Sequence, residues 1–178
     1  QQHKPLNISK LHIIVQSKDC DVTEVFKALH SQTSIKTLKV FAPHLENKDV
    51  CELVNLIDTL KLESLLLHCN ISKIYLTAIE HTIRDKRSIT ELSLTGEIGI
   101  VGANAIARIL QGSRLQSLEF YSSRVGEVEG LTIIRDSLRN SNVSRICVDA
   151  LLWRERSAGK KDTEIESLID EMNGIVRS

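Results

Sequence analysis

Aromatic side chains are scarce in this sequence, which has three Phe, two Tyr and one Trp among 178 residues. A core built from it must therefore be filled mainly by aliphatic side chains. Hydrophobic residues make up 42% of the chain, and a chain of this length fits one domain. We expect one domain with an aliphatic core.

An excess of charge of either sign is also lacking, because 23 Lys and Arg residues balance 23 Asp and Glu residues. Nucleic-acid-binding domains usually carry a basic excess, so we expect no nucleic acid among the partners. No apolar run approaches the roughly 18 residues that a membrane-spanning helix needs. No signal-like segment leads the chain. The sequence predicts a soluble protein without a membrane span.

The four cysteines form no CxxC pair and no cluster with histidine, so we expect no metal and no cofactor. Unpaired thiols favour a reducing compartment, and we predict a cytoplasmic protein. Three Asn-x-Ser triplets, at Asn7, Asn70 and Asn142, keep secretion open as the alternative. The chain begins with Gln1 rather than Met, and we expect it to be part of a longer chain.

A leucine pattern repeats along the chain. In LESLLLHCN, residues 62–70, the leucines at 62, 65 and 67 fit neither a helix face nor simple alternation. The same rhythm, with Ile, Val or Phe in some of the places, recurs with its central member at 11, 38, 65, 92, 118 and 146. The separations are 27, 27, 27, 26 and 28 residues. Six copies in register indicate a repeat protein.

Each copy predicts one short strand followed by one helix. Alternate side chains of a strand point to opposite faces, so the second and third apolar positions enter one core. Apolar residues then recur at helical spacing, and Asp21 with Glu24 predicts a capping box at the first helix. The stripes after the first and third strands are Val22, Val25, Phe26 and Leu29, and Tyr75, Ala78, Ile79 and Ile83. Stacked copies would form a parallel sheet covered by helices.

The end of the chain departs from the pattern. Residues 151–162 are polar, and they precede an amphipathic helix whose apolar side carries Ile165, Leu168, Ile169, Met172 and Val176. We expect one domain over residues 1–178, with repeats over 8–150 and a capping segment and helix over 151–178.

The copy LSLTGEIGIVGANAIARIL, residues 92–110, resembles the leucine-rich repeat of the long, ribonuclease-inhibitor-like class. In that class a strand and a turn precede I-G-x-x-G-A-x-A-I-A, which matches residues 98–107. The resemblance implies an α/β leucine-rich-repeat solenoid of about six repeats of 26–28 residues, with a concave parallel sheet and outer helices. The family's Asn or Cys after the last leucine is kept only at Asn70. The other copies carry Gln16, Pro43, Glu97, Ser123 and Leu151.

The same class of repeat occurs in cytosolic nucleotide-binding receptors of innate immunity, in activators of Ran-type GTPases and in tropomodulins. The resemblance therefore implies a non-enzymatic protein-interaction or ligand-sensing module. Its most specific form would be the sensor or autoinhibitory region of a larger intracellular receptor. Two alternatives stay open, namely a regulator of a small GTPase or of actin filaments, and a secreted recognition domain.

Residues that could carry chemistry have simpler explanations. His12 and His68 lie two predicted strands apart without a nearby Cys or Asp at ligand spacing, so they are poor metal ligands. The glycines of GEIGIVG, residues 96–102, lack the Lys-Ser/Thr of a phosphate loop, and the repeat explains them as a turn. Arg87 and Arg124 could act on a GTPase from loops, but loop arginines are usually only solvated.

The third, fifth and seventh positions of each copy are expected to face away from the helices. In the first half, Lys10 and Lys39 lie beside apolar residues, whereas Glu119 and Asp149 lie in the second half. Apolar residues rimmed by charge are typical of a partner site. We predict that a protein partner contacts Lys10, His12, Ile14, Lys39, Phe41, Leu66, His68, Glu119, Tyr121 and Asp149. In the alternative, Ile14 and Phe41 cover the end of the repeat array or meet upstream repeats.

Overall fold

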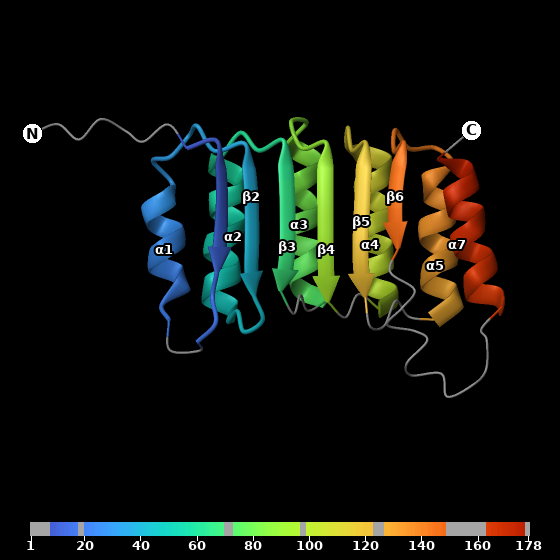
Figure 1. Ribbon diagram of the computed structural model, residues 1–178, viewed down its shortest axis with the longest axis horizontal. Helices are drawn as coiled ribbons and strands as arrows, with labels where there is room; N and C mark the ends of the chain where they lie inside the picture. The colour runs from blue at the N-terminus through green and yellow to red at the C-terminus, as the bar shows by residue number, and fades with distance from the viewer. Residues whose placement is uncertain are drawn as a thin grey trace, which may run out of the picture.

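A single parallel sheet and one row of helices make up the described part of the chain (Figure 1). The computed structural model describes residues 8–17, 20–69, 73–96, 99–122, 127–148 and 163–176. The strands are β1 (Lys10–Ile14), β2 (Thr37–Ala42), β3 (Ser64–Cys69), β4 (Glu91–Gly96), β5 (Ser117–Ser122) and β6 (Arg145–Val148). The helices are α1 (Val22–Leu29), α2 (Asn47–Thr59), α3 (Lys73–Asp85), α4 (Gly99–Gly112), α5 (Glu127–Leu138) and α7 (Thr163–Ile175). The predicted α/β class is confirmed.

The strands lie side by side in their chain order, and every neighbouring pair is parallel. Pairing joins equivalent positions of successive copies. Leu65 of β3, for example, lies between Leu38 of β2 and Leu92 of β4. Helices connect the strands, as parallel pairing requires. The register predicted from the leucine spacing is confirmed.

The core lies between the sheet and the helices. Leu38, Leu65, Leu92 and Leu118 are at most 1% exposed, and a continuous, mainly aliphatic cluster runs from α1 to α7. The first apolar position of each copy is also in this cluster, although Ile8 is only partly buried. Burial is weaker along β1, because this edge strand has a neighbour on one side only.

In Figure 1, α2, α3 and α4 lie behind the sheet, α1 lies beyond β1, and α5 and α7 lie beyond β6. Each helix packs against the next along the chain. The predicted C-terminal helix is present as α7, which packs against α5 with Ile165, Leu168 and Met172 buried. The segment predicted to cap the array, residues 151–162, lies outside the described residues.

The capping box predicted at the first helix does not form. Asp21 precedes α1 but makes no capping hydrogen bond, and Glu24 pairs with Lys27 at 2.8 Å instead. A capping contact forms at α2, where the backbone N–H of Glu46 donates to the carboxylate of Asp49 at 2.9 Å. Lys27, one turn away and exposed, forms an ion pair with Glu24, and the capping pattern did not predict this pair.

Two residues of the predicted apolar stripes face solvent. Val25 of α1 is 39% exposed, and Ala78 of α3 is exposed. Leu76 is buried beside Ile79 on the inward side of α3. The helix is therefore rotated relative to the stripe that the sequence suggested, because packing against the neighbouring helices selects which residues turn inward.

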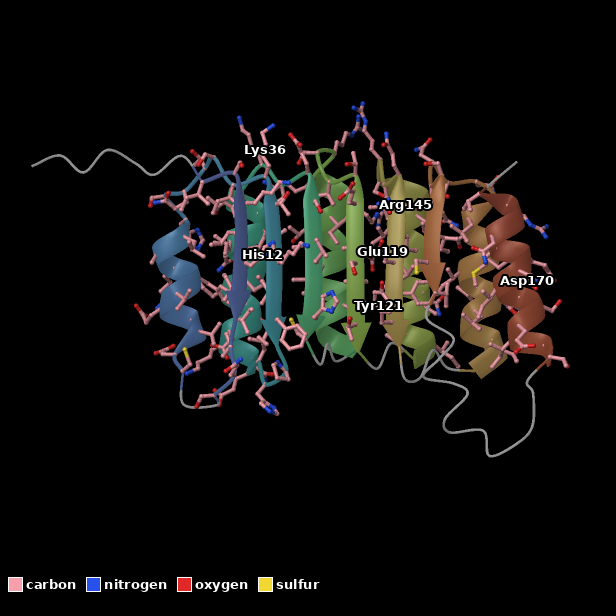
Figure 2. All side chains as sticks on the ribbon, viewed as in Figure 1. His12, Lys36, Glu119, Tyr121, Arg145 and Asp170 are labelled. Atoms are coloured by element: carbon pink, nitrogen blue, oxygen red, sulfur yellow. The ribbon has the colours of Figure 1, made fainter. Side chains whose placement is uncertain are left out.

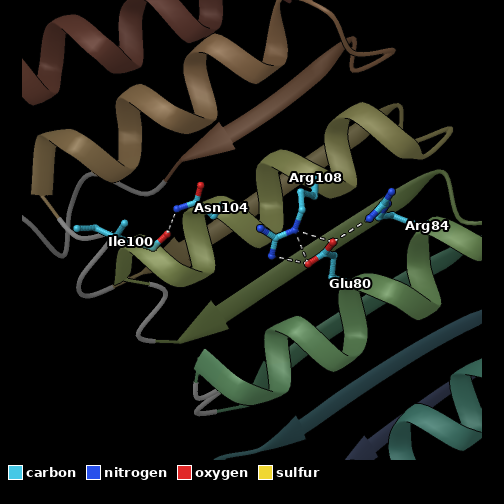
Figure 3. A network of polar contacts seen from close by, with 5 residues as sticks. All are labelled: Glu80, Arg84, Ile100, Asn104 and Arg108. Carbon is cyan, nitrogen blue, oxygen red and sulfur yellow. Dashed lines mark hydrogen bonds and ion pairs between the residues drawn. The ribbon is translucent and has the colours of Figure 1, made fainter.

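A buried carboxylate joins α3 to α4 (Figure 3). Glu80 of α3 is 1% exposed and accepts hydrogen bonds from Arg108 Nε at 2.8 and 2.9 Å and from a terminal Arg108 nitrogen at 2.7 Å. Arg84, one turn along α3, donates to Glu80 at 3.2 Å. Hydrogen bonding from Arg108, and then from Arg84, holds the pKa of Glu80 below its usual range against the opposing effect of burial.

Candidate partner-binding face

The side of the sheet that faces away from the helices is called the open face here. It carries three rows of side chains, one from each outward position of the strands. The first row is Lys10, Thr37, Ser64, Glu91, Ser117 and Arg145. The middle row is His12, Lys39, Leu66, Ser93, Glu119 and Cys147. The aromatic row is Ile14, Phe41, His68, Thr95 and Tyr121.

Nine of the ten predicted contact residues lie on this face, and Asp149 lies outside the described residues. Figure 2 shows His12, Glu119 and Tyr121 in front of the strands, with Arg145 near the opposite ends from Tyr121. The residues come from different strands and are far apart in sequence. The strand register brings them together on one face.

The aromatic row is nearly continuous from β2 to β5. The rings of Phe41 and His68 stack with centroids 5.9 Å apart at 26°, and His68 reaches Tyr121 at 6.1 Å and 32°. Between the last two lies Thr95, whose hydroxyl oxygen is 3.1 Å from Nδ1 of His68. Phe41 remains 54% exposed and Ile14 65% exposed. A large apolar surface therefore faces solvent along this row.

The ring of His68 is held toward its neutral form. Partial burial, and then the positive charge of Lys39, lowers the pKa of His68, while Glu119 opposes the change. Lys39 and Glu119 are therefore both close enough to influence the charge of His68. A neutral imidazole suits the stacked contact with Phe41, because it is less costly to cover than a charged ring.

Two adjoining hollows lie on the open face. One, of about 470 Å³, lies over the first and middle rows, and the other, of about 450 Å³, lies over the middle and aromatic rows. Both are lined by the same five residues of the middle row, His12, Lys39, Leu66, Ser93 and Glu119. The middle row is therefore the common floor of a trough that crosses the sheet.

Ser93 stands at the centre of this floor and lines both hollows. It is 3% exposed, and its hydroxyl has no hydrogen-bond partner among the described residues. Buried hydroxyls usually have partners, so Ser93 leaves a hydrogen bond unmade on the floor of the trough. The sequence placed Ser93 on this face, but nothing in the leucine pattern distinguished it from the other outward serines.

The charges of the middle row are separated along the sheet. Lys39 lies on β2 and Glu119 on β5, and neither makes a salt bridge within the described part of the chain. Glu91 lies 3.9 Å from Arg145, which also donates from Nε to Ser117 at 2.9 Å. In the first row, Arg145 partly neutralises Glu91. In the middle row, Lys39 and Glu119 stay open to contact with a partner.

Other kinds of site are not found among the described residues. No three His, Cys, Asp or Glu side chains come together as they would around a metal ion. No helix in this part of the chain has both the length and the apolar character to cross a bilayer. Cys20, Cys51 and Cys147 are exposed thiols, and Cys69 is a buried one.

Comparison with known proteins shows a similarity to a solved structure. No family model matches the chain, and no curated protein matches it. Among solved structures, the fold is similar to that of Leiomodin-1 Actin-Binding Site 2, with a TM-score of 0.58 and 16% sequence identity. The match covers 89% of this chain and 91% of that one. At this identity the similarity establishes a shared fold, a repeating α/β arrangement around a parallel sheet.

Proposed function

We propose that this protein is a non-enzymatic interaction module that holds a protein partner on the open face of its sheet. The observation that carries the proposal is the exposed aromatic row, in which Phe41 is 54% exposed while stacked on His68. Exposed apolar side chains beside unpaired charges are typical of binding surfaces. A hydrogen-bonded sheet holds these side chains in place before binding, so little ordering would be required.

Finer statements about the module rest on the sequence. The assignment to the leucine-rich-repeat class rests on the segment at 92–110 and on the six copies in register. The proposal that the module is not an enzyme rests on the lack of a nucleophile elbow, a phosphate loop or a dinucleotide fingerprint in the sequence. A cytoplasmic location and a receptor of innate immunity stay predictions from thiol content and resemblance.

Affinity capture tests the proposal with matched substitutions on the two sides of the molecule. We would compare the wild-type chain, Phe41→Asp on the open face and Val101→Asp on α4, where Val101 is 47% exposed. Both changes place a carboxylate at an exposed apolar position. Thermal unfolding would confirm that both variants are folded.

One partner captured by the wild type and by Val101→Asp, but lost with Phe41→Asp, would support the open face. Loss with Val101→Asp alone would move the site to the helices. Equal capture by all three chains would contradict a binding role for Phe41. The captured protein, identified by mass spectrometry, would then be tested with purified components.

Actin is a second candidate partner, favoured by the similarity in fold to an actin-binding site of Leiomodin-1. Sedimentation with actin filaments and fluorescence binding to monomeric actin would test it directly. Saturable binding that Phe41→Asp weakens would assign actin to the open face. Binding that Phe41→Asp leaves unchanged would assign it to another surface, and no binding to either form would remove this candidate.

A further inference from the structure

We infer that the occupant of the open face is an extended peptide segment of the partner. It carries an acidic side chain over Lys39 and a basic side chain over Glu119, about four or five residues apart. This inference rests on the proposed function and names the kind of partner that the same site would accept. It is carried by the trough, by two charges that make no salt bridge among the described residues, and by the hydroxyl between them, which has no partner there.

The spacing follows from the sheet. Lys39, Leu66, Ser93 and Glu119 occupy successive strands in one row. Three strand separations of about 4.8 Å place the two charged positions roughly 14 Å apart. An extended chain advances about 3.3 Å per residue, so about four or five residues span that distance.

The charges make an uncharged occupant costly. Lys39 and Glu119 are both half-buried, and Leu66 and Ser93 separate them. A bound segment that displaces water from the trough would leave each charge without solvent and without a partner. Such unpaired charges oppose binding unless the ligand supplies the opposite charges at both positions.

The hydroxyl of Ser93 fits the stretch between the two charges. It can donate a hydrogen bond to a carbonyl and accept one from an N–H. The backbone of an extended segment presents both groups to the floor of the trough, since it forms no internal hydrogen bonds. The aromatic row would take an apolar side chain of the same segment, in the hollow that Phe41, His68 and Tyr121 line.

An extended segment fits the trough better than a helix does. The first and aromatic rows are four residues apart along each strand, which is roughly 13 Å between backbone positions. Long side chains, including Arg145 on one side and Tyr121 on the other, reduce that width. A helix with its side chains is about 10–12 Å across and would rest on the rims instead of reaching Ser93.

Selection from a peptide library tests the inference independently of the direction in which a peptide crosses the sheet. The library would display random peptides of about twelve residues, long enough to cross the trough at about 3.3 Å per residue. The full chain would be used as wild type, Lys39→Glu and Glu119→Lys. The matched control is Glu129→Lys, a charge reversal at an exposed position of α5.

The wild type and Glu129→Lys should enrich peptides with one acidic and one basic residue about four or five positions apart. Lys39→Glu should instead enrich pairs of basic residues, and Glu119→Lys pairs of acidic residues, at the same spacing. A peptide selected by the wild type should bind either open-face variant about tenfold more weakly, and Glu129→Lys equally well.

Identical peptides from all four chains would overturn the inference, as would enrichment of none. A charge spacing of about nine residues would also overturn it, because that spacing indicates a helix at 1.5 Å per residue. Failure here is distinguishable from failure of the proposed function. If Phe41→Asp abolishes capture of the protein partner while no charged peptide is selected, the face binds and only the extended segment is wrong.

Discussion

The two faces of the same six strands follow different rules. On the side toward the helices, each strand presents aliphatic side chains that are almost fully buried, as at Leu65 and Leu67. On the open side the equivalent positions of successive strands change from lysine to leucine, serine and glutamate. The buried face must fit the same helix layer in every copy. The open face has no such constraint, so its side chains can vary to fit a binding partner.

Charge is treated differently on the two sides as well. Glu80 in the helix layer is buried and held by Arg108 and Arg84. Glu119 on the open face is half-buried and makes no salt bridge among the described residues. A satisfied buried charge contributes to the fold, whereas an unsatisfied charge at the surface is available for binding.

The largest expected contrast is between neighbouring leucines. Leu65→Ala should lower the free energy of unfolding by about 2–5 kcal/mol, because Leu65 is fully buried and its loss leaves a cavity. Leu66→Ala, one residue later on the open face, should cost less than about 1 kcal/mol. Urea denaturation of both variants measures the difference. Equal costs would mean that the open face is covered by another part of the molecule.

A second contrast concerns the two glutamates. Glu80→Gln should destabilise the protein by about 1–3 kcal/mol, since it weakens charge-assisted hydrogen bonds to Arg108 and Arg84. Glu119 makes no such bonds among the described residues, so Glu119→Gln should leave the free energy of unfolding within about 0.5 kcal/mol of the wild type. Chemical denaturation at neutral pH compares them. Destabilisation by Glu119→Gln of the same size would contradict the assignment of roles.

The pH dependence of stability should report Glu80 separately. Its pKa in the folded state lies below the ordinary value of 4.5. The stabilisation is therefore complete above the unfolded pKa and is lost as the pH falls from 4.5 through the lower folded pKa. Thermal unfolding of wild type and Glu80→Gln across this range should converge as the pH falls. Parallel curves would show that the charge of Glu80 contributes nothing.

A smaller effect is expected at the open face. The pKa of His68 should lie below its ordinary value of 6.5 in an NMR titration of the imidazole, chiefly because of burial. Lys39→Gln should raise this pKa, and Glu119→Gln should lower it further. The folded state binds fewer protons, so stability present above pH 6.5 decreases as the pH falls toward the folded pKa. If neither substitution changes the pKa of His68, Lys39 and Glu119 do not influence its charge.

The cysteines allow a comparison of chemical reactivity between buried and exposed positions. Burial raises the pKa of Cys69 to about 12, whereas Cys20, Cys51 and Cys147 are exposed. A thiol reagent should therefore modify these three in the native protein and Cys69 only after unfolding. Mass mapping of labelled peptides checks this. Rapid native labelling of Cys69 would indicate that β3 opens readily.

The leucine spacing was sufficient to predict the strands, their order and their register. Strand side chains alternate with a period of two, and a one-residue shift would have placed Leu66 in the core instead of Leu65. The helices were less predictable. Val25 and Ala78 belong to apolar stripes by spacing, yet both face solvent. Helical spacing leaves the rotation of a helix uncertain, because several overlapping faces satisfy the same pattern.

Local periodicity and copy length were enough to predict the repeat, the α/β class and the described residues that share the open face. The contacts between copies could not be predicted in this way. Glu80 and Arg108 are 28 residues apart, and nothing in either helix alone marks them as partners. The stacking of Phe41 on His68, the trough and the unpartnered Ser93 depend in the same way on side chains from different strands. Such contacts arise from packing in three dimensions, which no local pattern encodes.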